Sequence, residues 1–182
     1  MNILVTGANG QLGNEMRALS AENGQHTYFF TDVQELDICD EQAIRAFVSG
    51  NRVDVIVNCA AYTAVDKAED NPELCDKLNH IAPGYLAAAA EACGAAMIQV
   101  STDYVFDGTG HIPYTEEEPT CPASVYGSTK LAGEQNVMDH CEKAMVIRTA
   151  WLYSIYGNNF VKTMIRLGQE RDSLGVIFDQ IG

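Results

Sequence analysis

The stretch Thr6-Gly7-Ala8-Asn9-Gly10-Gln11-Leu12-Gly13 decides the fold, because it joins an apolar run directly to a segment with helical character. Its three glycines follow the pattern Gly-x-x-Gly-x-x-Gly. Glycines in such a loop permit a tight turn and a close approach of the backbone to a pyrophosphate, and the free N–H groups at a helix start supply donors. The glycines alone fit a plain structural turn equally well, but the flanking segments favour a dinucleotide site.

Outward from this loop, apolar runs alternate with helical stretches along the chain, which is typical of an α/β protein with a doubly wound parallel sheet. The expected strands are residues 2–6, 27–31, 54–58, 96–100, 144–148 and 174–178. The expected helices are residues 11–21, 40–49, 71–93, 125–141 and 159–170. Pro83 lies inside the third of these helices and cannot donate to the carbonyl of Asn79, four residues earlier.

Charge and composition exclude several classes of function. The 11 Lys and Arg residues against 25 Asp and Glu leave a net charge of −14, which argues against partners such as nucleic acid or an acidic membrane surface. No apolar run reaches the roughly 18 residues of a membrane span. The six cysteines form no Cys-x-x-Cys pair, so we interpret them as reduced, mostly buried thiols. Without a basic, cleavable leader at its start, the chain is expected to be cytoplasmic.

Asp32 closes the second expected strand and bears on the choice of cofactor. A carboxylate there accepts hydrogen bonds from both hydroxyls of an adenosine ribose, and it repels the 2′-phosphate of NADP, so it favours NAD. A Lys or Arg brought in from elsewhere would relax that preference. Asp37 and Ile38 are placed to flank the adenine, although an Asp near a helix start is equally expected as a local cap.

Tyr126 and Lys130 lie four residues apart, and so on one face of the expected helix 125–141. A neighbouring cation stabilises phenolate, so we expect Lys130 to lower the pKa of Tyr126 and the phenol to donate its proton to a developing alkoxide. Thr102 follows the fourth strand, at the edge where open α/β sheets bind ligands, and its hydroxyl can hold a substrate carbonyl. Each of these features alone is also common in purely structural contexts.

Together, the glycine loop, Thr102 and the Tyr126-x-x-x-Lys130 pair resemble the extended short-chain dehydrogenase/reductase family. Within it, the chain is similar to the dTDP-4-dehydrorhamnose reductases over essentially its whole length. The stretches that carry this resemblance are residues 57–69, 101–106, 125–134, 148–151 and 179–180.

The resemblance implies NADH- or NADPH-dependent reduction of the 4-keto group of dTDP-4-dehydrorhamnose to dTDP-L-rhamnose. It implies Tyr126 as general acid, Lys130 as the group that holds the nicotinamide ribose, and Thr102 as the group that positions the carbonyl. The cofactor-binding residues implied are Gly7, Gly10, Gln11, Leu12, Gly13, Asp32, Asp37, Ile38, Ala61, Tyr62, Thr63, Tyr126 and Lys130. The substrate-binding residues implied are Thr102, Asp103 and Trp151, although a lone tryptophan is more often a core aromatic.

The resemblance also implies how the chain is organised. Residues 1–150 would form an NAD(P)-binding Rossmann domain, and residues 151–182 the start of a small substrate domain plus the sixth strand. Because family members are longer, we expect this chain to be a fragment that binds dinucleotide yet turns over poorly. A homodimer is compatible with the family.

Two further roles are implied by the same resemblance. Some reductases of this type place a glutamate at the position of Glu15 to hold Mg²⁺ between two subunits, although a glutamate early in a helix is also favoured by the dipole alone. The backbone carbonyl of Asn79 would hold a water in a proton relay from Lys130, and we expect Pro83 to keep that carbonyl free.

Two alternative functions stay open at this point. Nucleotide-sugar dehydratases and epimerases of the same family differ in chemistry, and the dehydratases carry Thr-Asp-Glu where this chain has Thr102-Asp103-Tyr104. The missing glutamate favours reduction. A non-catalytic subunit that kept the cofactor fold is the second alternative, and the intact Thr102, Tyr126 and Lys130 argue against it.

Overall fold

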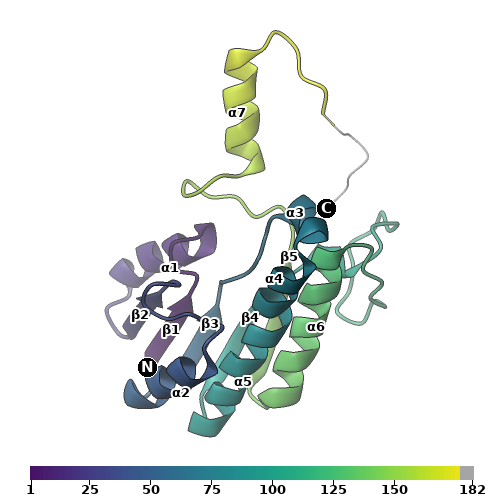
Figure 1. Ribbon diagram of the computed structural model, residues 1–182. Helices are drawn as coiled ribbons and strands as arrows, with labels where there is room; N and C mark the ends of the chain where they lie inside the picture. Colours follow the sequence, from purple (N-terminus) through teal and green to yellow (C-terminus); the bar gives the residue numbers. More distant parts are fainter. Residues whose placement is uncertain (177–182) are drawn as a thin grey trace.

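Five parallel strands form the centre of the fold in the computed structural model, which describes residues 1–176 (Figure 1). Their order within the described chain is β2-β1-β3-β4-β5. This is one of the two common doubly wound orders, and it places a switch in winding direction between β1 and β3. The strands are β1 (Asn2–Thr6), β2 (Thr27–Thr31), β3 (Val55–Asn58), β4 (Ala96–Thr102) and β5 (Ala144–Thr149).

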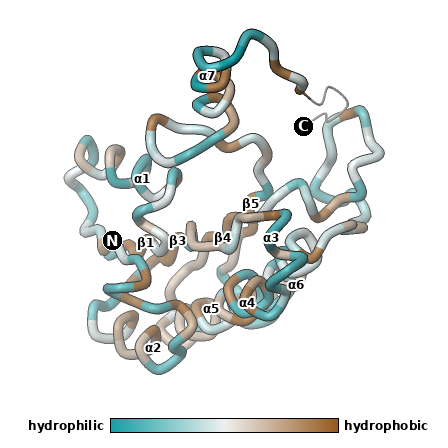
Figure 2. Tube along the Cα trace, turned by 45° about the horizontal axis from the view of Figure 1, so that its top comes forward, coloured by the Kyte–Doolittle hydropathy of each residue, from teal (hydrophilic) through white to brown (hydrophobic). Residues whose placement is uncertain are grey.

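The helices cover both faces of the sheet, as Figure 2 shows with α1 on one side and α2, α5 and α6 on the other. The helical elements among the described residues are α1 (Gln11–Glu22), α2 (Glu41–Gly50), α3 (Val65–Asp70), α4 (Pro72–Asp76), a π-helical segment (Lys77–Ile81), α5 (Ala82–Cys93), a 3-10 turn (Asp103–Val105), α6 (Val125–His140) and α7 (Phe160–Glu170). None of the helices within residues 1–176 has the length and apolar character needed to cross a membrane.

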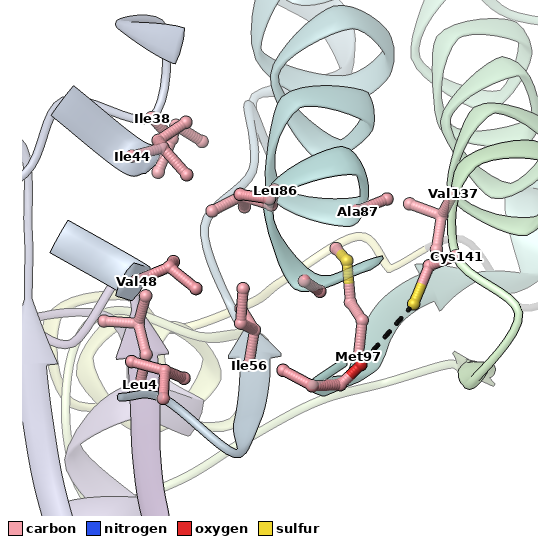
Figure 3. Packing of buried hydrophobic residues seen from close by; sticks show 14 of the residues in the cluster. Leu4, Ile38, Ile44, Val48, Ile56, Leu86, Ala87, Met97, Val137 and Cys141 are labelled. Carbon is pink, nitrogen blue, oxygen red and sulfur yellow. Dashed lines mark hydrogen bonds between the residues drawn. The ribbon is translucent and has the colours of Figure 1, made fainter. Parts of the chain in front are cut away.

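Alternation along the strands divides the core in two, because successive side chains point to opposite faces. Leu4, Ile56 and Met97 face α2, α5 and α6 in the larger cluster, where they meet residues such as Leu86 and Val137 (Figure 3). The smaller cluster on the α1 side contains Ile3, Val5 and Val57, with Met16 of α1 packed against it. Burial on both faces explains why these strands are nearly continuous apolar runs.

Helix α7 stands beyond the carboxyl ends of the strands, apart from the layers formed by the other helices (Figure 1). None of its residues is buried. Phe160, Val161 and Ile165 leave a large part of their surface exposed on it. Figure 2 shows hydrophobic residues along α7.

The doubly wound parallel sheet predicted from the sequence is confirmed, and the first five strands lie within two residues of their predicted bounds. Several details differ. Of the predicted strand 174–178, residues 174–176 have no regular secondary structure, and residues 177 and 178 lie outside the described residues. The predicted helix 71–93 contains the π segment before Pro83. All six cysteines are free, but only Cys75 and Cys141 are buried, so the prediction of mostly buried thiols is wrong.

Candidate active site

A cavity of about 730 Å³ lies at the carboxyl ends of the strands, beside the switch between β1 and β3. Ligands of open α/β sheets bind at this position because the loops on either side diverge there. The cavity brings together most of the predicted site residues, which come from six separate stretches of the chain: Gly7, Gly10, Gln11, Leu12, Asp32, Asp37, Ile38, Ala61, Thr63, Thr102, Asp103, Tyr126, Lys130 and Trp151.

The glycine loop has the geometry that a pyrophosphate needs. Gly7 has a φ of +62°, and a Cβ there would lie 2.7 Å from the backbone of Ala60, so only glycine fits. Gly10 is the N-cap of α1 and offers no side-chain cap. The N–H groups of the first helical turn therefore stay available to an anion at the positive end of the helix dipole.

Three predicted site residues do not line the cavity. Gly13 is buried beneath the loop, where a Cβ would lie 2.5 Å from the Gly7 carbonyl oxygen, so it serves close packing of α1. The Tyr62 hydroxyl donates to the Lys67 carbonyl at 3.3 Å. Glu15 belongs to no group of three or more His, Cys, Asp or Glu side chains within residues 1–176, and its role at a Mg²⁺ ion between two subunits stays a prediction.

The Asp32 carboxylate is held at the end of β2 by backbone donors. It accepts from the N–H of Val33 at 2.9 Å and from that of Asn9, in the glycine loop, at 3.1 Å. These bonds fix the carboxylate on the cavity wall, and its contact with a ribose stays a prediction. Asp37 accepts from the Cys39 N–H at 2.9 Å, and the residue whose side chain caps α2 is Asp40 instead.

Tyr126 and Thr102 meet at the floor of the cavity. Ser124 caps α6 by accepting from the Gly127 N–H at 3.0 Å, and this sets Tyr126 in the first turn, 9% exposed. The Tyr104 ring meets the Tyr126 ring edge-on, with 5.6 Å between centroids. Burial raises the pKa of Tyr126, and hydrogen bonding with the Thr102 side chain partly offsets that rise.

Lys130 is 3% exposed, and its ammonium donates to the Val100 carbonyl oxygen at 2.6 Å. Burial lowers the pKa of Lys130 to about 8. The pKa of Tyr126 is raised rather than lowered in this structure, because desolvation of the phenol dominates, and a lowering by Lys130 stays a prediction. Spacing on a helix brought the two residues to one face but did not reveal how deeply they are buried.

Trp151 lies on the cavity wall with an uncommon backbone conformation. Its φ is +51°, a left-handed value that is rare for a bulky residue. Its side chain is 49% exposed and packs edge-on against Phe160 of α7, at 5.4 Å between ring centroids. The alternative that Trp151 is a core aromatic is therefore excluded.

Asn79 is a site residue whose side chain the sequence reasoning missed. Its amide oxygen accepts from the Tyr62 N–H at 2.8 Å, and its nitrogen donates to the Tyr62 carbonyl at 3.1 Å. This pair of hydrogen bonds to Tyr62 fixes the loop after β3, which presents Ala61 and Thr63 to the cavity. The 17-residue separation of the two partners gave no signal in the sequence.

The backbone around Asn79 is shaped by the π segment, of the kind often found at functional sites. The Asn79 carbonyl oxygen lies so close to α6 that a Cβ added at Gly133 would overlap it. The water relay through this carbonyl stays a prediction.

Comparison with known proteins assigns the chain to a family. The family model described as "RmlD substrate binding domain" matches residues 1–182. The chain belongs to the RmlD substrate binding domain family. Among curated members, the dTDP-4-dehydrorhamnose reductase of Salmonella typhimurium is 47% identical over 186 residues, which cover 100% of this chain and 62% of that protein. The Streptomyces griseus protein of the same name is 47% identical over 98% of this chain and 59% of its own length.

Solved structures of RmlD relatives agree with the fold. A dTDP-4-dehydrorhamnose reductase from Clostridium acetobutylicum has a TM-score of 0.92 and 49% identity, over 96% of this chain and 61% of that one. The Bacillus anthracis enzyme of that name, solved in complex with NADP, has a TM-score of 0.88 and 41% identity over 93% and 60%. The chain thus spans about three fifths of the length of these RmlD relatives.

Proposed function

We propose that this chain is the cofactor-binding part of a dTDP-4-dehydrorhamnose reductase, which converts the 4-keto group of dTDP-4-dehydrorhamnose into the alcohol of dTDP-L-rhamnose. The observation that carries this proposal is that the glycine loop and the trio Thr102, Tyr126 and Lys130 line one cavity. The names of the relatives supply the substrate class, a dTDP-sugar.

A reduced nicotinamide dinucleotide, when bound, supplies the hydride for this reaction. The first turn of α1 and the loop at Gly7 and Gly10 would hold its pyrophosphate, since no side chain caps the N–H groups at this helix start. Asp32 would hold the adenosine ribose. Ala61 and Thr63, on the loop fixed by Asn79, would flank the nicotinamide.

Tyr126 is the proposed general acid. Reduction of a ketone adds hydride to carbon and one proton to oxygen, so the site must supply a protonated group beside the carbonyl. Burial, which raises the pKa of Tyr126, keeps the phenol protonated at neutral pH. The Thr102 hydroxyl, which donates to the Asp103 carboxylate at 3.0 Å, lies at the end of β4, where it would orient the carbonyl oxygen.

The choice between NADH and NADPH rests on opposing observations. The Asp32 carboxylate on the cavity wall favours NADH, while a relative at 41% identity was solved with NADP. We propose that either dinucleotide binds and that Asp32 reduces the preference for NADPH.

Two features favour reduction over the alternatives. Tyr104 occupies the position of the dehydratase glutamate, and its ring packs on Tyr126 rather than supplying a carboxylate. A purely regulatory role would not require Thr102, Tyr126 and Lys130 to converge in the cofactor cavity. The division at residue 150, a homodimer and the poor turnover of this chain alone remain proposals of the same scheme, and no step is assigned to Mg²⁺.

The test combines binding with turnover. NADH and NADPH are titrated into the chain by calorimetry, and oxidation of each is followed with dTDP-4-dehydrorhamnose as substrate. The variant Tyr126→Phe should keep dinucleotide affinity within about twofold and lose at least roughly a hundredfold in any reduction rate, the usual size of a general-acid contribution. Absence of dinucleotide binding by the chain, or turnover of the complete reductase that Tyr126→Phe leaves unchanged, would overturn the proposal.

A further inference from the structure

Glu134 is a buried carboxylate that the site described so far does not use. It lies on α6, one helical turn after Lys130, and is 6% exposed. It accepts a short hydrogen bond from the Ser101 hydroxyl. The Arg148 guanidinium donates to both of its oxygens, at 3.0 Å from Nε to Oε1 and 2.6 Å from Nη2 to Oε2.

These contacts join three elements beside Lys130. Ser101 of β4 and Arg148 of β5 are paired across the sheet, and Glu134 bonds to both. The carbonyl that accepts from Lys130 belongs to Val100, the neighbour of Ser101. Consecutive residues of β4 are therefore bound by two side chains of α6, spaced by one turn, which fixes the helix along the strand.

The charges around Lys130 are few. Among the described residues, Glu134 of α6 and the Cys75 thiol of α4 are the charged or acidic groups that act on it, while Arg148 of β5 is paired with Glu134. Burial disfavours the charged ammonium, and the negative charge of Glu134 is the largest effect that opposes this. The Arg148 guanidinium forms a bidentate pair with this buried carboxylate.

We propose that Glu134 is a positioning residue: it holds α6 in register with β4 and supplies the negative charge that keeps the Lys130 ammonium protonated on the Val100 carbonyl. Arg148 and Ser101 hold Glu134 in place for this task. The proposal rests on the role of Lys130 in the proposed function, but its test reads the ammonium itself.

The experiment measures the titration of Lys130 in the 182-residue chain by NMR, from its ε-methylene resonances, which are assigned by their loss in Lys130→Met. The test variants are Glu134→Gln and Arg148→Met. The double variant Glu134→Gln/Arg148→Met removes both charges together, so it avoids the uncompensated buried charge that can unfold a single variant. Ser101→Ala removes one hydrogen bond and keeps the carboxylate.

The two single variants should act in opposite directions. In Glu134→Gln and in the double variant, the pKa of Lys130 should fall below its value of about 8. In Arg148→Met, an uncompensated Glu134 should raise it, and Ser101→Ala should change it least. If the role of Glu134 were purely structural, both single variants would shift the pKa of Lys130 in the same direction. A shift in the same direction in both, or an unchanged pKa in the double variant, overturns the proposal. The proposed function is tested separately by NADH and NADPH titration of the wild-type chain.

Discussion

The Asn159 side-chain amide donates a 3.0 Å hydrogen bond to the Gln11 side-chain oxygen, across 148 residues of sequence. Gln11 begins α1 at the glycine loop, and Asn159 begins the turn into α7. Gly157 also lies against the Gln11 side chain, because a Cβ added at Gly157 would lie only 3.0 Å from the Gln11 Cγ. The segment that carries Trp151 is thereby fastened to the loop proposed to bind pyrophosphate.

Removing this contact should loosen the segment 151–159. In Gln11→Ala, we expect faster hydrogen exchange of these amides, measured by mass spectrometry. Asn159→Ala should do the same and in addition weaken the start of α7, because the Asn159 oxygen accepts from the Lys162 N–H at 3.0 Å. Loss of such a cap costs about 1 kcal/mol. Unchanged exchange in Gln11→Ala would show that the contact does not hold the segment.

Gly13 should tolerate no side chain. The added Cβ of Gly13→Ala would lie 2.5 Å from the backbone of Gly7 and Ala8, so α1 must shift away from the loop. We expect the free energy of unfolding, measured by urea denaturation, to fall by about 1–3 kcal/mol, as overpacking usually costs. Dinucleotide affinity should fall as well. Gly24→Ala is the matched control, since nothing lies within 4 Å of a Cβ there, and an equal loss in both variants would refute the steric explanation.

The buried ammonium of Lys130 should make stability depend on pH. Its pKa is lowered from 10.5 to about 8 on folding, so between these pH values the unfolded chain binds more protons than the folded chain. Stability attributable to Lys130 therefore rises as pH increases from about 8 to 10.5, by a total on the order of 3 kcal/mol. Across this pH range, the free energy of unfolding should rise more in the wild type than in Lys130→Met. A constant difference would contradict the burial of a charged lysine.

Asp32 should set the preference between the two dinucleotides. Asp32→Asn removes the charge that opposes a 2′-phosphate, and we expect the ratio of NADPH to NADH affinity to rise about tenfold, equivalent to roughly 1.4 kcal/mol. Calorimetric titration measures both affinities. The control is Glu35→Gln, which alters the carboxylate that accepts from the Asp32 N–H at 2.9 Å. A similar rise in both variants would mean that general charge, rather than contact with the ribose, decides the preference.

Sequence patterns were sufficient for the sheet and for most of the cavity wall. Strands such as β1 and β3 are buried on both faces, so their apolar runs are unambiguous, and parallel strands bring their ends to one edge. Thr102 ends β4 and Asp32 follows β2 at this same edge, which explains why both were placed correctly in the cavity.

Long-range contacts and burial could not be inferred in this way. The pairs Asn79 with Tyr62 and Glu134 with Arg148 depend on how helices dock on the sheet. The raised pKa of Tyr126 depends on desolvation, which spacing along a helix does not reveal. The short helix α3 was missed because its six residues show no clear apolar periodicity.

The order of the strands in the sheet also bears on how the chain folds as it is synthesised. The first strand made, β1, lies inside the sheet, and its partners β2 and β3 are both complete by residue 58. After that, β4 and β5 are each added at the edge left by the strand before. A chain leaving the ribosome can thus extend a formed sheet one strand at a time, which shortens the period in which an apolar strand waits for its partner.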